Sequence, residues 1–218
     1  AQLEKLVGNR KNLNKTCEIR HSPDVISMND KPSHAMRHGK NSSMWGTIDA
    51  VKDKDADAAV SCGNTGALMA ISMIRLRKLP GVYRPAIAIL WPSASELGFN
   101  FMLDVGADIR ADAPDLLKYA LMGASYARNG FGLKRPRVGL LNVGTEEHKG
   151  RSELKEAHEL ISESTEHGEY EYVGFVEGND IPSDRVDVIV TDGFTGNIAL
   201  KTGEGTASMI AAAMRESF

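Results

Sequence analysis

The sequence is poor in cysteine and in aromatic residues. Of its 218 residues, 2 are cysteine, and aromatic residues make up 6%. Cys17 and Cys62 cannot build a disulfide framework, and neither belongs to a C-x-x-C motif of the kind found in zinc and redox sites. This usage is typical of a reducing compartment, so we expect a cytoplasmic protein.

Long apolar runs and long basic runs are absent as well. No stretch of about 18 consecutive apolar residues occurs, so the sequence predicts no membrane-spanning helix. The net charge is -3 and no Lys/Arg run is long enough to form a basic arm, which argues against nucleic acid as a partner. The 42% hydrophobic and 25% charged residues are ordinary for a globular protein with a buried core.

Several common catalytic motifs are missing. The chain has neither the phosphate-binding motif G-x-x-x-x-G-K-[ST] nor the nucleophile motif G-x-S-x-G. Two G-x-G pairs, beginning at Gly130 and Gly203, do not complete the dinucleotide fingerprint. His34 and His38 could share a helical face, but no H-E-x-x-H motif or third ligand accompanies them. The sequence therefore predicts no metal site and no bound cofactor.

Short apolar segments alternate with helical patterns along most of the chain. This alternation predicts an α/β fold with a mostly parallel sheet and helices on both faces. The predicted strands are 57–62, 85–91, 100–105, 138–143, 170–176 and 186–191, and the predicted helices are 67–78, 112–129, 151–166 and one after 197. Before these, we expect a short strand at 16–20 and a helix with an irregular start over 32–54.

The predicted domain organisation is one α/β catalytic region covering residues 1–218, because no internal repeat or low-complexity linker divides the chain. Ala1 is not an initiator methionine, and Phe218 follows a helical pattern without a stop signal. We therefore expect the chain to be a fragment of a longer protein that lacks N-terminal and C-terminal parts.

Residues 137–150 combine a buried strand, a glycine loop and the start of a helix. Gly144 frees the backbone, and Lys149 lies near the predicted helix entrance. The N–H groups at a helix start, together with one ammonium group, form a natural anion site. The alternative is an ordinary connection with a solvated lysine, and His148 is more simply a bystander than a base.

Four predicted strands end in polar loops that contain glycine, and ligands bind at the carboxyl ends of parallel strands. These loops are 63–66, 104–106, 144–146 and 192–197. Their matching chemistry predicts one convergent site, whereas structural turns alone are the alternative. Cys62, beside the first loop, is interpreted as a small buried residue rather than a nucleophile. The candidate substrate- and phosphate-binding residues are Asn64, Thr65, Gly66, Asp104, Gly144, Thr145, Asp192, Gly193 and Thr195.

Residues 61–69 (SCGNTGALM), 103–107 (LDVGA), 136–146 and 190–197 resemble motifs of the bacterial acyl-ACP:phosphate acyltransferases, the PlsX family. The resemblance runs from about Lys31 to the end. It implies transfer of a fatty acyl group from acyl carrier protein to inorganic phosphate, giving acyl phosphate for phospholipid synthesis. It also implies a fold similar to isocitrate and isopropylmalate dehydrogenases, a homodimer, and peripheral association with the inner face of the membrane.

The resemblance places the family's catalytic lysine and asparagine at Lys149 and Asn197. The chemistry of the residues agrees, since phosphate is itself the nucleophile and needs only to be held beside an oxyanion donor. Lys149 suits the phosphate and the Asn197 amide suits the oxyanion, while Asp104 and Asp192 suit loop orientation. Two alternatives are a dehydrogenase of the related fold and a non-catalytic regulator that binds acyl carrier protein. The sequence does not indicate the acyl chain length.

Overall fold

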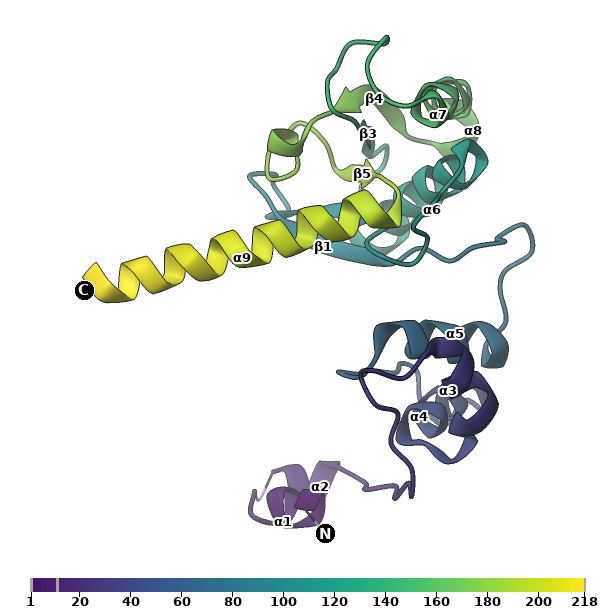
Figure 1. Ribbon diagram of the computed structural model, residues 1–218, viewed down its shortest axis with the longest axis vertical. Helices are drawn as coiled ribbons and strands as arrows, with labels where there is room; N and C mark the ends of the chain where they lie inside the picture. The colour runs from purple at the N-terminus through teal and green to yellow at the C-terminus, as the bar shows by residue number, and fades with distance from the viewer. Residues whose placement is uncertain (1, 11, 218) are drawn as a thin grey trace. The chain divides into compact units, whose positions relative to one another are not determined.

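The chain forms two compact units, Ala1–Leu79 and Pro80–Phe218, each described here by itself. The computed structural model describes residues 2–10 and 12–217 (Figure 1). The expectation about the chain ends rests on Ala1 and Phe218, which lie outside the described residues. A single catalytic region over 1–218 stays a prediction.

The first unit is helical. Its core is made by the apolar faces of three helices and includes the buried side chains of Ala35, Trp45 and Ile71. Ser42 and Asn64 cap two of these helices, because their side-chain oxygens accept hydrogen bonds from first-turn N–H groups. The helices of the unit are α1 (Gln2–Gly8), α2 (Leu13–Thr16), α3 (Pro32–His38), η1 (Gly39–Asn41), α4 (Ser43–Lys52) and α5 (Thr65–Arg75).

Four predictions for this unit are wrong. No strand forms at 16–20 or at 57–62, and among the described residues this unit contains no other strand with which an extended segment could pair. Val60 is 88% exposed, and Cys62 is exposed rather than buried. The helix expected over 32–54 is interrupted, because Ser42 caps a new helix after a short 3-10 turn.

The second unit contains a five-stranded sheet with the strand order β1-β2-β5-β3-β4. β1 pairs with β2 in antiparallel orientation, whereas the β2–β5, β5–β3 and β3–β4 pairs are parallel. The prediction of a mostly parallel sheet is therefore confirmed. The strands are β1 (Ala88–Pro92), β2 (Phe99–Leu103), β3 (Arg137–Leu141), β4 (Glu171–Val176) and β5 (Val188–Val190).

Alternate residues of the strands enter two separate cores. Phe101 and Val188 belong to the core under one face of the sheet, whereas Met102 and Ile189 belong to the core under the other. This follows from the period of two in a β-strand, and it explains why β5 is apolar throughout and β2 is apolar except at Asn100. Both faces are therefore buried, as the sequence predicts.

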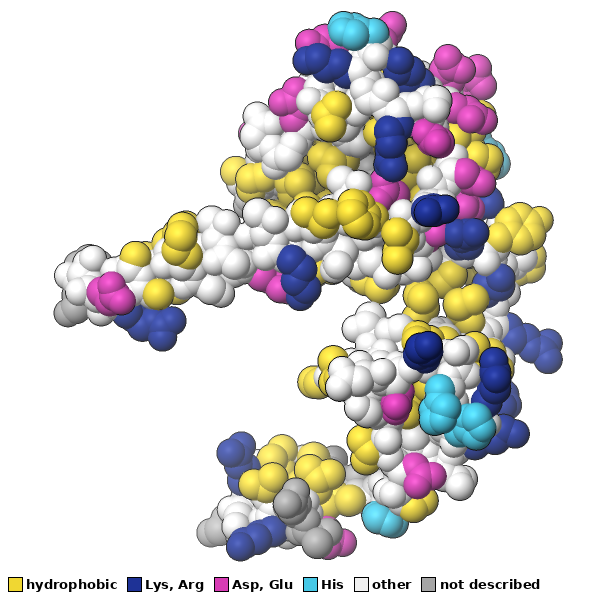
Figure 2. Space-filling view, in the orientation of Figure 1, with side chains coloured by type: hydrophobic (Ala, Val, Ile, Leu, Met, Phe, Trp, Pro, Cys, Tyr) yellow, Lys and Arg dark blue, Asp and Glu magenta, His cyan; other side chains and the backbone are white. Residues whose placement is uncertain are grey.

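Helices cover the two faces unequally (Figure 1). One face packs against α6 and α7, and the first part of α9 packs on the other, where Trp91 occupies the position that a β-carbon on Gly203 would need. The outer part of α9 extends beyond the sheet with apolar side chains on its surface (Figures 1 and 2). The helices are α6 (Ala113–Phe131), α7 (Ser152–Glu163), α8 (Thr165–Gly168), η2 (Gly178–Asp180) and α9 (Gly193–Ser217).

Candidate active site

Three loops of the second unit meet at one edge of its sheet. They follow β2, β5 and β3, which are adjacent and parallel, so their carboxyl ends lie side by side. The segments 104–106, 144–146 and 192–197 therefore start at the same edge, although 193–197 is the first turn of α9 rather than a loop; that they form one site stays a prediction. The fourth loop, 63–66, does not follow a strand, and it lies in the first unit.

Asp104 organises the loop after β2. Its fully buried carboxylate accepts hydrogen bonds from the backbone N–H groups of Ile87 at 2.8 Å, Ala107 at 3.1 Å and Asp108 at 2.6 Å. Burial raises the pKa of Asp104, and the backbone donors oppose this shift. The carboxylate is therefore used to hold the loop, in keeping with the orienting role inferred from the sequence.

Asp192 caps the start of α9. Its side-chain oxygens accept hydrogen bonds from the backbone N–H of Thr195 at 2.8 Å and from the Thr195 hydroxyl at 3.0 Å. The residue is 2% exposed, and Arg151 forms an ion pair with it. The cap therefore also joins α9 to the loop after β3.

Two glycines allow α9 to approach the loop after β2. The Gly193 N–H donates to the Asp108 carbonyl oxygen at 2.8 Å, and a β-carbon on Gly193 would lie 2.7 Å from Oδ2 of Asp104. A β-carbon on Gly196 would lie 2.0 Å from the Asp104 carbonyl oxygen. Any larger residue would push the helix away from this loop.

Asn197 is the fifth residue of α9, one turn inside the helix. It therefore does not cap the helix, since Asp192 has that role. Its side chain is exposed and faces Gly106, where a β-carbon would lie 3.7 Å from Cγ of Asn197. Within the described chain, its amide has no hydrogen-bond partner, so both amide hydrogens are available to a ligand.

Lys149 lies across the loop after β3. A β-carbon on Gly144 would be 2.3 Å from Cδ of Lys149, so a larger residue there would displace the lysine side chain. The ammonium group of Lys149 pairs with Glu146 at 2.8 Å. This contact raises the pKa of Lys149 and lowers the pKa of Glu146, so both groups are charged at neutral pH.

Gly150 completes the turn into α7. Its φ of 87° lies in the left-handed region, and a β-carbon there would lie 2.3 Å from Oδ1 of Asn142. Arg151 occupies the N-cap position of α7, and no described side chain caps that helix. Cationic groups of Lys149 and Arg151 thus flank a helix start whose first N–H groups lack intrahelical partners.

The remaining candidates have different environments. Thr145 is exposed within the Lys149 loop. In the first unit, Asn64 caps α5 and its amide donates to the Ser27, Met28 and Asp30 carbonyl oxygens at 2.9–3.2 Å. Thr65 is exposed at the first position of α5. A β-carbon on Gly66 would meet Pro32 at 2.9 Å, so Gly66 allows close packing of α3 and α5.

Sequence reasoning missed Arg151 and Asp108. Arg151 could have been noticed as a second cation next to Lys149 at the start of a helix. Asp108 is 5% exposed; it pairs with Arg84 and accepts a hydrogen bond from the Tyr119 hydroxyl at 3.3 Å. Burial, followed by the charge of Asp108, raises the pKa of Tyr119.

Two further observations concern metals and membranes. No cluster of three or more His, Cys, Asp or Glu side chains suited to a metal ion occurs among residues 2–10 and 12–217. Over the same residues, none of the helices has both the length and the apolar character needed to cross a membrane.

The fold and its strand-end loops define an α/β protein with a candidate site at the carboxyl edge of the sheet. The profile described as "Fatty acid synthesis protein" matches residues 1–218, and the chain therefore belongs to that family. Two similar relatives are named "Phosphate acyltransferase". The one from Jannaschia sp. (strain CCS1) is 69% identical over 217 residues, and the one from Paracoccus denitrificans (strain Pd 1222) is 67% identical over 218. The family resemblance read from the sequence is confirmed.

The chain spans about 60% of the length of these curated relatives, although 100% of the chain is matched. Among solved structures, EutD phosphotransacetylase from Staphylococcus aureus aligns with a TM-score of 0.57 and 17% identity. The alignment covers 91% of this chain and 71% of that one. At this identity the likeness concerns the fold alone.

Proposed function

We propose that this chain transfers a fatty acyl group from acyl carrier protein to inorganic phosphate and so forms acyl phosphate for phospholipid synthesis. The observation that carries the proposal is its 69% identity, across the whole chain, to a relative named phosphate acyltransferase. The free amide of Asn197 and the cations beside α7 supply the groups that this reaction needs.

The chemistry requires positioning more than activation. A phosphate oxygen attacks the thioester carbon, a carbon–oxygen bond forms, and the carbon–sulfur bond then breaks. The proton of hydrogen phosphate goes to the departing thiolate of the carrier, so the step balances without a cofactor. Holding the two reactants together and stabilising the oxyanion are the largest contributions a protein can make here.

The residues divide these tasks between them. Lys149, with Gly144 beneath its side chain and Thr145 beside it, binds the phosphate. Asn197 donates to the oxyanion that forms on the thioester oxygen. Asp104, Asp192, Gly193 and Thr195 fix the start of α9.

The proposed partners and location are those that the family resemblance implies. Acyl carrier protein and phosphate are the proposed partners, and the chain acts as a cytoplasmic homodimer with peripheral contact to the inner face of the membrane. The apolar surface of the outer part of α9 supports this assembly, because Met209, Ile210 and Met214 are 66%, 51% and 57% exposed.

The proposal is tested by incubating the purified chain with acyl carrier protein bearing a fatty acyl group, with and without phosphate. Acyl phosphate is measured directly by mass spectrometry alongside the free carrier thiol. We expect both to appear only with phosphate. Carrier binding without turnover would favour the regulator, and nicotinamide-dependent oxidation of a hydroxy acid would favour the dehydrogenase.

A further inference from the structure

A cleft of about 380 Å³ lies beside the candidate active site. Its walls come from the ends of β3 and β5, the start of α7, the turn η2 and one side of α9. Most of the surface that they present is apolar. The apolar side chains are those of Leu141, Val143, Leu154, Ile181, Ile198 and Ala199.

The cleft is continuous with the proposed phosphate site. Arg151, Asp192 and Thr195 form part of its wall, and Gly150 next to them is adjacent to Lys149 in the chain. Asn142, another wall residue, donates a hydrogen bond from its amide to the Lys149 carbonyl oxygen at 3.2 Å. A molecule in the cleft therefore reaches the Lys149 loop without leaving the protein surface.

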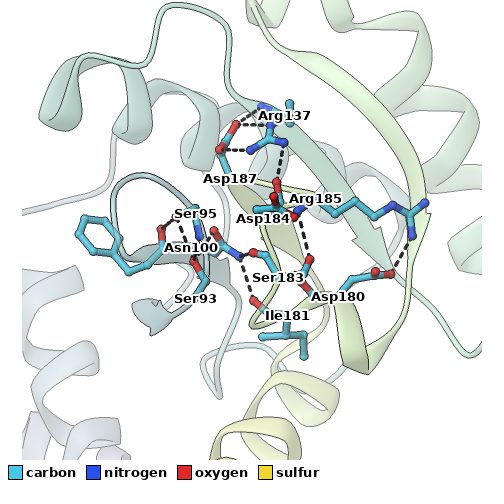
Figure 3. Close-up of polar contacts among 11 residues, drawn as sticks. Ser93, Ser95, Asn100, Arg137, Asp180, Ile181, Ser183, Asp184, Arg185 and Asp187 are labelled. Atoms are coloured by element: carbon cyan, nitrogen blue, oxygen red, sulfur yellow. Dashed lines mark hydrogen bonds and ion pairs between the residues drawn. The ribbon is translucent and has the colours of Figure 1, made fainter.

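The wall formed by Ile181 is held by a buried polar network (Figure 3). The amide of Asn100, which is fully buried, donates to the carbonyl oxygens of Ile181 at 2.9 Å and Ser183 at 2.8 Å. The Ser93 hydroxyl donates to the Asn100 side-chain oxygen at 2.9 Å. Ile181 itself is 4% exposed, so the wall is packed in place before any ligand binds.

Other parts of the cleft wall are unusually exposed for apolar residues. Val143 is 80% exposed and Ile198 is 51% exposed. Both would lose contact with water if a hydrocarbon lay against them, and this loss is the main source of affinity for apolar ligands. A nucleotide or sugar would instead meet walls with few hydrogen-bonding partners.

We propose that this cleft binds the hydrocarbon chain of the acyl group, with the thioester end at the Lys149 loop. The inference rests on the proposed function, and it assigns the acyl-chain site that the sequence left open. A ligand with one polar reactive end and one long apolar end matches a cleft with polar groups at one side and apolar walls elsewhere. Each methylene that the cleft covers should raise kcat/KM about fourfold until the cleft is full.

Gly178 offers a direct test, because it lies in the cleft wall and a β-carbon on it would meet no atom within 4 Å. Gly178→Phe therefore adds a large side chain without a backbone clash. Ile198→Lys is the second variant, and it places a charge on an exposed cleft position that tolerates substitution. Gly46→Phe is the matched control, since Gly46 is exposed, has equally open space and belongs to the first unit.

The measurement is kcat/KM for palmitoyl and butyryl carrier proteins, with circular dichroism to verify folding. For both cleft variants, we expect kcat/KM with the palmitoyl carrier to fall about tenfold or more, which corresponds to losing the contact of about two methylenes. With the butyryl carrier, kcat/KM should change little. The control should keep the wild-type ratio, and the phosphate KM should not change in any variant. An unchanged palmitoyl-to-butyryl ratio in both folded cleft variants would overturn the acyl-chain site. Absence of acyl phosphate with either carrier in the wild type would instead overturn the proposed function.

Discussion

Arg151 and Asp192 form an ion pair between the loop after β3 and the start of α9, although 41 positions separate them in the sequence. The Asp192 side chain is 2% exposed, whereas that of Arg151 is 60% exposed. Asp192 also caps α9 through the Thr195 backbone, so one carboxylate fixes two of the three loops at the candidate site.

Replacing Arg151 with methionine should therefore weaken both folding and catalysis. It leaves the buried carboxylate of Asp192 with one strong partner fewer, and a hydrogen bond to a charged group contributes about 2 kcal/mol. Denaturant titration should therefore show a decrease of about that size in the free energy of unfolding. Arg151→Lys should recover only part of it, because an ammonium cannot reproduce the geometry of a guanidinium. Wild-type stability in Arg151→Met would show that the pair does not join the loops.

Asn197→Ala should lower kcat by roughly 10²–10³ and leave the phosphate KM nearly unchanged, as expected for loss of one oxyanion donor. Because Asn197 lies inside α9 and caps nothing, the free energy of unfolding should also change little. Asp192→Ala is the contrasting variant, and loss of that cap should cost about 1 kcal/mol or more. Full activity per folded molecule of Asn197→Ala would remove the oxyanion role.

Lys149→Ala should raise the phosphate KM and lower turnover, since its charge acts on bound phosphate before and during the reaction. The raised pKa of Lys149 means that its positive charge is lost only above the ordinary lysine value of about 10.4. The phosphate KM of the wild type should consequently show no lysine titration between neutral pH and about pH 9. A kcat decrease with an unchanged phosphate KM in Lys149→Ala would place Lys149 away from the phosphate.

Glu146→Gln should improve phosphate binding, because Glu146 competes with phosphate for the ammonium group of Lys149. The lowered pKa of Glu146 keeps this competition in place above the ordinary glutamate value of about 4.3, and it disappears only as the pH falls through the lowered pKa. Exposed pairs are weak, so the phosphate KM should fall about two- to fivefold at low salt. The gain should shrink at high salt; a raised KM would mean that Glu146 positions the lysine.

The sequence predicts those elements whose signals are local. Residues 138–143 and 151–166 correspond to β3 and α7, and the Asp112-Ala113-Pro114 signal lies at the observed start of α6. The segment 57–62 has an apolar, strand-like composition, yet no strand forms, because a strand also needs a neighbour in space. Composition alone does not supply that information.

The same contrast between local signals and long-range contacts applies to the candidate site. Glycine-rich segments at strand ends indicated the candidate site, and they placed Lys149 and Asn197 after the neighbouring strands β3 and β5, with Asn197 in the first turns of α9 rather than in a loop. The start of α9 was harder to predict, since Gly193 and Gly196 disfavour a helix locally and are needed only for their approach to Asp104. The Arg151–Asp192 pair joins distant segments, so no local pattern indicates it.

Attack of phosphate on the acyl thioester at this site can be followed by isotope labelling. Phosphate labelled with ¹⁸O on all its oxygens is supplied, and mass spectrometry of the intact acyl phosphate follows the oxygen that joins carbon to phosphorus. If phosphate is the nucleophile, this bridging oxygen carries the label, and one carrier thiol is released for each acyl phosphate formed. Unlabelled product, or thiol release at the same rate without phosphate, would contradict it.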